Sequence, residues 1–376
     1  MLFQLPGCQV FPEYSYEWLE SEFDTLETRE ADPFYISDET KVKLKEANAY
    51  WSGKTTSELA TSYMDERAAA AIEHNIFTPG NYFYNGVGHV TVKYDEVLKT
   101  GFRGIIDRTK SELESHSVGE PDYSVRHEFL KAVIISCEAA VTYAKRYAAL
   151  ARELSQKESD IVRSRELLKI AENCERVPEY GARNFYEACQ SFWFVQELLQ
   201  TESSGHSISP GRFDQYMYPY YKADLDAGKI DYDTALELVE CLWLKYSEWA
   251  WTISANTADF FAGYTNFENL TVGGTTKDGR DGTNDISYMA IQATKETKCH
   301  QPTLSCRIHA DCPPAFMEAV TDLVSTGSGF PVNTGPMLYF APPSTKSLPF
   351  FTQYSLQAGR KGGGACSVWI FWAVSR

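Results

Sequence analysis

The stretch Ser204-Gly-His-Ser-Ile-Ser-Pro-Gly-Arg-Phe-Asp-Gln-Tyr216 is the most unusual part of the chain. It opens with small polar residues, which are typical of a loop, and runs into a dense aromatic segment at residues 213–221. Before it, residues 184–200 place apolar side chains at helical spacing on a wide face, which predicts a core helix. A histidine and a serine thus stand side by side between a core helix and an aromatic cluster.

His206 and Ser207 are candidate functional residues because of the chemistry that a neighbouring imidazole and hydroxyl can share. Together they can orient a polyol by hydrogen bonds, and the histidine can pass a proton to a leaving hydroxyl. The alternative is a helix-capping loop in which both side chains satisfy backbone groups. Ser207 is followed by Ile208 and Ser209, so the Gly-x-Ser-x-Gly pattern of a hydrolase is absent, and we expect Ser207 to bind rather than attack.

Two more segments place candidate residues among glycines. His89 ends Asn85-Gly-Val-Gly-His89, a flexible turn that lets backbone approach a ligand closely. Tyr264 precedes Asn269-Leu-Thr-Val-Gly-Gly274, an extended piece whose glycines lack the spacing of a dinucleotide-binding or Walker loop. The alternatives are a structural or surface histidine in the first segment and a tight turn or close strand crossing in the second.

The rest of the chain is dominated by helical patterns. Residues 303–308 alternate like a short strand, and Asp231 offers an N-cap to the segment that follows it. Short strands surrounded by helices predict an α/β architecture. We expect helices at 40–49, 56–75, 127–159 (long and largely buried), 160–174, 184–200, 233–249, 284–296 and 313–325.

Composition and charge narrow the class of protein. The 376 residues are 43% hydrophobic and 14% aromatic, which is typical of a folded chain with a large core. The formal net charge of −16 repels phosphate backbones and anionic lipids, so we expect no nucleic-acid or membrane partner. No apolar run approaches the roughly 18 residues that span a bilayer, and no basic segment precedes an apolar one at the start. We therefore expect a cytoplasmic protein.

The cysteine pattern favours reduced thiols over disulfides. The 9 cysteines are widely spaced, without any Cys-x-x-Cys. Residues 299–312 concentrate cysteines and histidines, but only Cys306, His309 and Cys312 have gaps typical of a structural zinc site. A strand at 303–308 would distribute these side chains over two faces, so no metal is expected.

Taken in order, several blocks of this sequence resemble the glycyl radical enzymes, the pyruvate formate-lyase-like superfamily. The resemblance runs from about residue 9 to residue 331, and the Gly205-His206-Ser207 block together with His89 is most similar to glycerol and propane-1,2-diol dehydratases. The blocks are Val10-Phe-Pro-Glu-Tyr14, Gly80-Asn-Tyr-Phe-Tyr-Asn-Gly-Val-Gly-His-Val90, Ser204 to Tyr216, Asn269-Leu-Thr-Val-Gly-Gly274 and Gln301-Pro-Thr-Leu-Ser-Cys-Arg307.

The resemblance implies a ten-stranded α/β barrel made of two antiparallel five-stranded halves and ringed by helices, of which this chain would supply roughly the first half. The implied cofactor is a glycyl radical on a C-terminal segment, installed by a separate S-adenosylmethionine activase. In the family this radical oxidises a cysteine to a thiyl, which takes a hydrogen atom from the substrate; a glutamate then removes the hydroxyl proton and water leaves. The implied partners are a small polyol, the activating enzyme and a second copy in a homodimer.

The resemblance also assigns roles by position. His89, His206 and Ser207 match residues that hydrogen-bond the substrate, with His89 suited to help the departing hydroxyl and Tyr264 lining the pocket. The expected activity is B12-independent elimination of water from glycerol or propane-1,2-diol. The alternatives are a choline or hydroxyproline lyase, an arylacetate decarboxylase, a formate C-acetyltransferase, or a non-catalytic truncated scaffold.

The pattern of the family ends near residue 331, which divides the chain into a pyruvate formate-lyase-like part, 1–331, and an atypical tail, 332–376. The family's Asn-Asp pair, Gly-Cys-x-Glu loop and Arg-Val-x-Gly block do not follow. Cys366 lies near the distance expected of the thiyl cysteine, but Ser367-Val368 stands where a glutamate is needed. We therefore predict a frameshift or premature stop near residue 331 and a chain that does not run the radical chemistry by itself.

Overall fold

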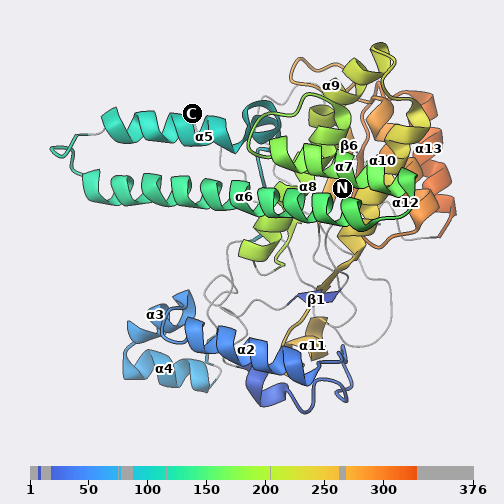
Figure 1. Cartoon of the computed structure of the whole chain (residues 1–376). Helices are drawn as coiled ribbons and strands as arrows, with labels where there is room; N and C mark the ends of the chain where they lie inside the picture. Colours follow the sequence, from blue (N-terminus) through green and yellow to red (C-terminus); the bar gives the residue numbers. More distant parts are fainter. Residues whose placement is uncertain are drawn as a thin grey trace.

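The computed structural model describes residues 7–9, 18–74, 76–77, 88–115, 117–203, 205–261 and 268–327 (Figure 1). Tyr264, Cys366 and the segment 332–376 lie outside the described residues. The expectations about them, and the boundary at residue 331, stay predictions.

Helices make up most of the described chain. The predicted helices are all present, except that 56–75 is two helices, because Asp65 caps a second one by accepting a hydrogen bond from the backbone N–H of Ala68 at 2.8 Å. The aromatic run at 213–221 is also helical. The helices are α2 (Asp38–Trp51), α3 (Thr56–Ser62), α4 (Glu66–Glu73), α5 (Tyr94–Ser115), α6 (Tyr123–Lys157), α7 (Ile161–Arg176), α8 (Phe185–Glu202), α9 (Phe213–Asp226), α10 (Tyr232–Ser247), α11 (Ala255–Phe261), α12 (Asp285–Thr297) and α13 (Pro314–Ser325).

Helix α6 corrects one expectation, since it is long but not largely buried. Phe129 and Ile135 are 65% and 66% exposed, whereas Ala144 and Ala151 are buried. In Figure 1, α5 and α6 lie side by side and extend away from the other helices as a hairpin. A helix that is covered on one side buries only a stripe of its surface, and the small buried residues let α7 approach α6 closely.

The described strands are short and all pair in parallel. β1 (Gly7–Gln9) pairs with β5 (Trp249–Trp251), and β2 (Val90–Thr91) pairs with β3 (Ile208–Ser209). β4 (Gly211–Arg212), β6 (Asn269–Gly273) and β7 (Thr303–Arg307) form a sheet in the order β4-β6-β7. The strand expected at 303–308 is thus confirmed. Within the described ranges the strands form separate small sheets, and the ten-stranded barrel stays a prediction.

The main core packs α8, α9, α10 and α12 around the β4-β6-β7 sheet. Phe213 of α9 and Trp243 of α10 are 0% exposed, with ring centroids 6.0 Å apart. Asp231 caps α10, as expected, by accepting a hydrogen bond from the backbone N–H of Thr234 at 2.9 Å. Gly273 and Gly274 have φ of +73° and +76°, and a Cβ added to Gly273 would lie 2.9 Å from the Phe316 ring, so both left-handed backbone and a close approach require glycine at the end of β6. In the part of the chain that the structure describes, no helix is long and apolar enough to cross a membrane.

Candidate functional site

The short β2–β3 pair brings His89 and His206 together. Val90 pairs with Ile208, so His89 and Ser207 directly precede the two strands, and His206 is one residue before Ser207. The imidazole centroids are 4.6 Å apart, with the ring planes at 67°. His206 is 8% exposed and Ser207 is 2% exposed. Three of the four residues predicted for the site therefore meet at one place, where His206 and Ser207 are buried and His89 is half-buried, while the fourth, Tyr264, lies outside the described residues.

The backbone at this place is tight. The N–H of His89 donates a hydrogen bond to the carbonyl of His206 at 3.0 Å, and a Cβ atom added to Gly88 would lie 2.0 Å from that same oxygen. His89 and Ser207 have φ of +53° and +57°, a left-handed region that residues other than glycine rarely occupy. Such conformations persist only where the surroundings enforce them, and they concentrate at functional sites.

The end of α8 fixes the loop that carries His206. The backbone N–H of His206 donates to Ser203 Oγ at 3.1 Å, and the N–H of Gly205 donates to the carbonyl of Gln200 at 2.8 Å. Capping of the helix is thus done by Ser203, not by Ser207. The Ser207 hydroxyl is buried without a hydrogen-bond partner among the described residues. The capping alternative therefore leaves the Ser207 side chain unexplained, and a ligand hydroxyl would satisfy it.

Both imidazoles have lowered pKa values. Burial, and then the neighbouring His89, lower the pKa of His206 from 6.5 to about 4. Burial also lowers the pKa of His89. At neutral pH both rings are therefore uncharged, and each presents one nitrogen that donates and one that accepts a hydrogen bond.

We expect the stability of the chain to fall as pH drops from 6.5 to about 4. Below pH 6.5 the unfolded chain protonates His206 while the folded chain does not, so the contribution present above 6.5 is lost as pH falls through the folded pKa. The loss attributable to His206 is on the order of 3 kcal/mol. Urea unfolding of the parent and of His206→Gln across this range measures it. The variant should lose less stability, whereas His74→Gln, on an exposed residue after α4, should behave like the parent.

Gln196 and Tyr94, which sequence analysis did not select, connect the two segments that carry the candidate residues. Gln196 of α8 is 0% exposed; its Nε2 donates to the carbonyl of Ile208 at 2.8 Å, and its Oε1 accepts a hydrogen bond from the hydroxyl of Tyr94. A signal was available, because buried glutamines are unusual in a helix as apolar as α8. Their polarity indicates that partners exist within the protein.

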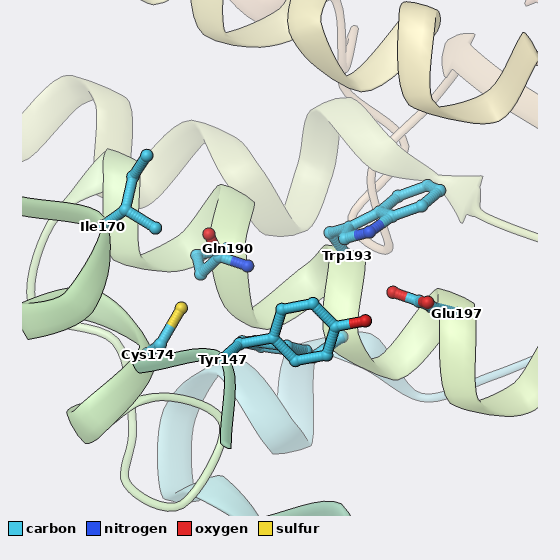
Figure 2. A pocket seen from close by; sticks show the side chains of 7 residues that line it. Tyr147, Ile170, Cys174, Gln190, Trp193 and Glu197 are labelled. Atoms are coloured by element: carbon cyan, nitrogen blue, oxygen red, sulfur yellow. The ribbon is translucent and has the colours of Figure 1, made fainter. Parts of the chain in front are cut away.

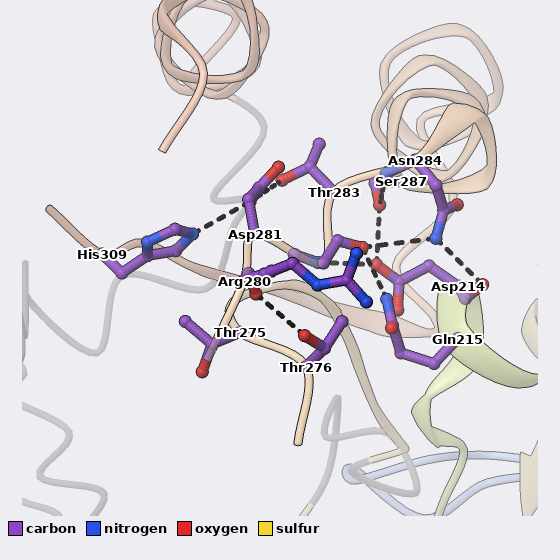
Figure 3. A network of polar contacts seen from close by, with 12 residues as sticks. Asp214, Gln215, Thr275, Thr276, Arg280, Asp281, Thr283, Asn284, Ser287 and His309 are labelled. Atoms are coloured by element: carbon purple, nitrogen blue, oxygen red, sulfur yellow. Dashed lines mark hydrogen bonds and ion pairs between the residues drawn. The ribbon is translucent and has the colours of Figure 1, made fainter. Parts of the chain in front are cut away.

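The cysteines and histidines near β7 take part in hydrogen bonding and packing. His309 Nε2 lies 2.9 Å from Asp281 Oδ1 in a polar network that includes Asp214 and Ser287 (Figure 3). Burial raises the pKa of the Cys306 thiol to about 12, so it is protonated. Among the described residues, no group of three or more histidine, cysteine, aspartate or glutamate side chains is placed to hold a metal ion.

A small pocket lies among α6, α7 and α8 (Figure 2). None of its lining residues is one of the predicted site residues. It is lined by Tyr147, Ile170, Cys174, Gln190, Trp193, Phe194 and Glu197.

Comparison with known proteins gives consistent results. The pyruvate formate lyase-like family matches residues 3–335. An isethionate sulfite-lyase of Desulfovibrio desulfuricans is 38% identical over 342 residues, which cover 86% of this chain and 41% of that protein. The chain thus spans about two fifths of the length of the curated relatives it matches.

Solved structures extend the likeness to the fold. A structure on 1,2-propanediol dehydration in Roseburia inulinivorans has a TM-score of 0.80 and 53% identity, over 87% of this chain and 41% of that one. The glycerol-bound B12-independent glycerol dehydratase of Clostridium butyricum has a TM-score of 0.79 and 48% identity, over 86% of this chain and 41% of that one. The chain has an α/β fold shared with the corresponding part of these enzymes. It belongs to the pyruvate formate lyase-like family of glycyl radical enzymes.

Proposed function

We propose that the protein to which this chain corresponds is a glycyl radical dehydratase that eliminates water from glycerol or propane-1,2-diol. The observation that carries the proposal is the close pair of His89 and His206 beside the Ser207 hydroxyl, which is buried without a hydrogen-bond partner among the described residues. A 1,2-diol presents two adjacent hydroxyls, each of which donates one hydrogen bond and accepts others. Two uncharged imidazoles and one serine hydroxyl supply a matching set of donors and acceptors. The products are an aldehyde and water.

In this proposal His206 and Ser207 bind and orient the diol, and His89 donates a hydrogen bond to the hydroxyl that departs. That bond stabilises the oxygen as the C–O bond breaks. Tyr264 lines the pocket beside them. The glycyl radical, carried on a C-terminal segment of the complete protein and installed by a separate activase, supplies hydrogen-atom abstraction. The described residues fit such chemistry because they offer uncharged hydrogen-bonding groups in a buried place.

The charge of the site distinguishes a neutral diol substrate from an anionic sulfonate substrate. A relative at 38% identity is an isethionate sulfite-lyase, so cleavage of a carbon–sulfur bond is the second candidate. Isethionate carries a permanent negative charge, and burial of an anion without a cation is costly. His89 and His206 are uncharged at neutral pH and would not neutralise a sulfonate. The pair therefore favours a neutral diol.

The proposal includes the architecture expected from the sequence. Residues 1–331 would form the first part of a ten-stranded barrel, and 332–376 an atypical tail. We also propose that the complete protein is a cytoplasmic homodimer and acts on a small-molecule substrate. A truncated, non-catalytic scaffold remains the alternative for this polypeptide, and a defined, saturable complex formed by the isolated chain would favour that alternative.

The test is turnover by a protein of full family length that contains residues 1–331 of this chain. Sequencing of the gene downstream of the Ser325 codon, with translation in all three frames, tests whether another reading frame encodes the remainder of such a protein. After anaerobic activation, we expect aldehyde from glycerol or propane-1,2-diol and no sulfite from isethionate. Release of sulfite from isethionate, with no aldehyde formed from either glycerol or propane-1,2-diol, would overturn the diol assignment. The 376-residue chain, treated in the same way, should show no glycyl radical signal by electron paramagnetic resonance.

A further inference from the structure

The two segments that carry the candidate residues are joined by very little regular structure. β2 and β3 share only two residue pairs, Val90 with Ile208 and Thr91 with Ser209. A two-stranded pairing of this length is not stable alone in water. His89 and Ser207, which border it, are both held at positive φ. Other contacts must therefore fix the spacing between the imidazole and hydroxyl groups.

Gln196 supplies such contacts from α8. Its Nε2 donates to the carbonyl of Ile208, the residue after Ser207, at 2.8 Å. Its Oε1 accepts from the hydroxyl of Tyr94, which follows β2 as the first residue of α5. One fully buried amide thus bonds to both site segments and uses its donor and its acceptor.

The surroundings of Tyr94 make this connection rigid. Tyr94 is 1% exposed, with its ring centroid 4.8 Å from that of Phe192 and 5.5 Å from that of Tyr216. The hydroxyl of Tyr216 in turn donates to the carbonyl of Pro210 at 2.9 Å. Alternate carbonyls of the segment after Ser207 are therefore held by side chains from α8 and α9.

We propose that Gln196 is a positioning residue, which holds the His89 segment and the Ser207 segment, through Tyr94 and Ile208, at the spacing needed to bind one small ligand. The identity of that ligand as a diol rests on the proposed function. The spacing itself does not, because it follows from contacts within the described chain. A buried amide with two directional bonds fixes relative position better than an apolar side chain of the same size.

The test compares Gln196→Leu with Gln190→Leu in the 376-residue chain. Both glutamines lie on α8 and are at most 2% exposed, but Gln190 faces the pocket among α6, α7 and α8. The first readout is hydrogen exchange of the His89 amide, which is bonded to the His206 carbonyl. We expect exchange to be at least about 10-fold faster in Gln196→Leu, relative to amides within α12, and unchanged in Gln190→Leu.

The second readout is the titration of His206 by NMR. A merely structural loss would leave the His206 environment intact in the folded protein, whereas loss of positioning should hydrate the ring. We therefore expect the pKa of His206 to rise from about 4 toward 6.5 in Gln196→Leu. Gln196→Glu keeps the acceptor for Tyr94 but loses the donor to Ile208. We expect it to raise the pKa of His206 less than Gln196→Leu does.

If Gln196→Leu does not fold, Tyr94→Phe tests the positioning role of Gln196 instead. It removes one hydroxyl and keeps the ring packed, so faster exchange at the His89 amide is again expected. The proposal is overturned if folded Gln196→Leu, or Tyr94→Phe in its place, exchanges and titrates like the parent. Neither readout needs turnover or a radical. Failure of the dehydratase assignment would thus leave this result standing, and the reverse also holds.

Discussion

His206→Ala, in a protein of full family length, is expected to lower kcat/KM for diol dehydration by at least about 10²-fold while the glycyl radical signal is unchanged. The His206 imidazole is buried, with its ring centroid 4.6 Å from that of His89. Alanine removes a donor and an acceptor and leaves His89 and Ser207 as the described groups for the substrate. Anaerobic kinetics with glycerol and propane-1,2-diol, together with electron paramagnetic resonance on the same samples, measure both quantities.

The control for this prediction is His74→Ala, on an exposed residue that follows α4, apart from the β2–β3 pair. It should retain parental kinetics and radical content. Ser207→Ala should give a smaller loss, about 10-fold, because it removes a single hydroxyl. If His206→Ala turns over within about threefold of the parent, the assigned role of the imidazole is wrong. A loss of radical signal together with turnover would instead indicate a defect in activation.

Helix positions were accessible from the sequence because their signals are local. The apolar period marks α8, α10, α12 and α13, and the Asp231 cap marks the start of α10. Burial was less accessible, since it depends on what packs against each face. The apolar residues of α6 predict a core helix, but α6 projects with α5 and leaves Phe129 and Ile135 in solvent (Figure 1). No local pattern shows whether other described helices pack against the outer face of α6.

The sequence predicts the individual residues of the candidate site but not that they lie together. The glycine-rich turn and the Gly205-His206-Ser207 block each indicate a function, but their meeting depends on a parallel pairing between distant segments. The positive φ values of His89 and Ser207 were not predictable, because glycine is the usual residue in that conformation. Gln196 could have been selected by asking why a buried helix contains amides. That question identifies polar residues whose partners lie elsewhere in the fold.

The Gly88→Ala substitution is expected to destabilise the protein by about 3 kcal/mol. The added Cβ would lie 2.0 Å from the His206 carbonyl oxygen and 2.9 Å from its carbonyl carbon, and backbone cannot yield as a flexible side chain can. Relief requires β2 to move away from the His206 loop, which breaks the hydrogen bond from the His89 N–H to that same oxygen. Steric strain and the lost hydrogen bond therefore add. Urea unfolding of variant and parent measures the difference.

The matched control is Gly119→Ala, between α5 and α6. The nearest atom to its added Cβ is Ser117 Oγ at 3.8 Å, and neither Gly88 nor Gly119 has a positive φ, so neither substitution places alanine in the left-handed region. Gly119→Ala should change the free energy of unfolding by less than about 0.5 kcal/mol. Equal stability of the two variants would mean that β2 and the His206 loop are not in close contact. In that case His89 and His206 would not form one site, since the approach of the two backbones is what places their rings 4.6 Å apart.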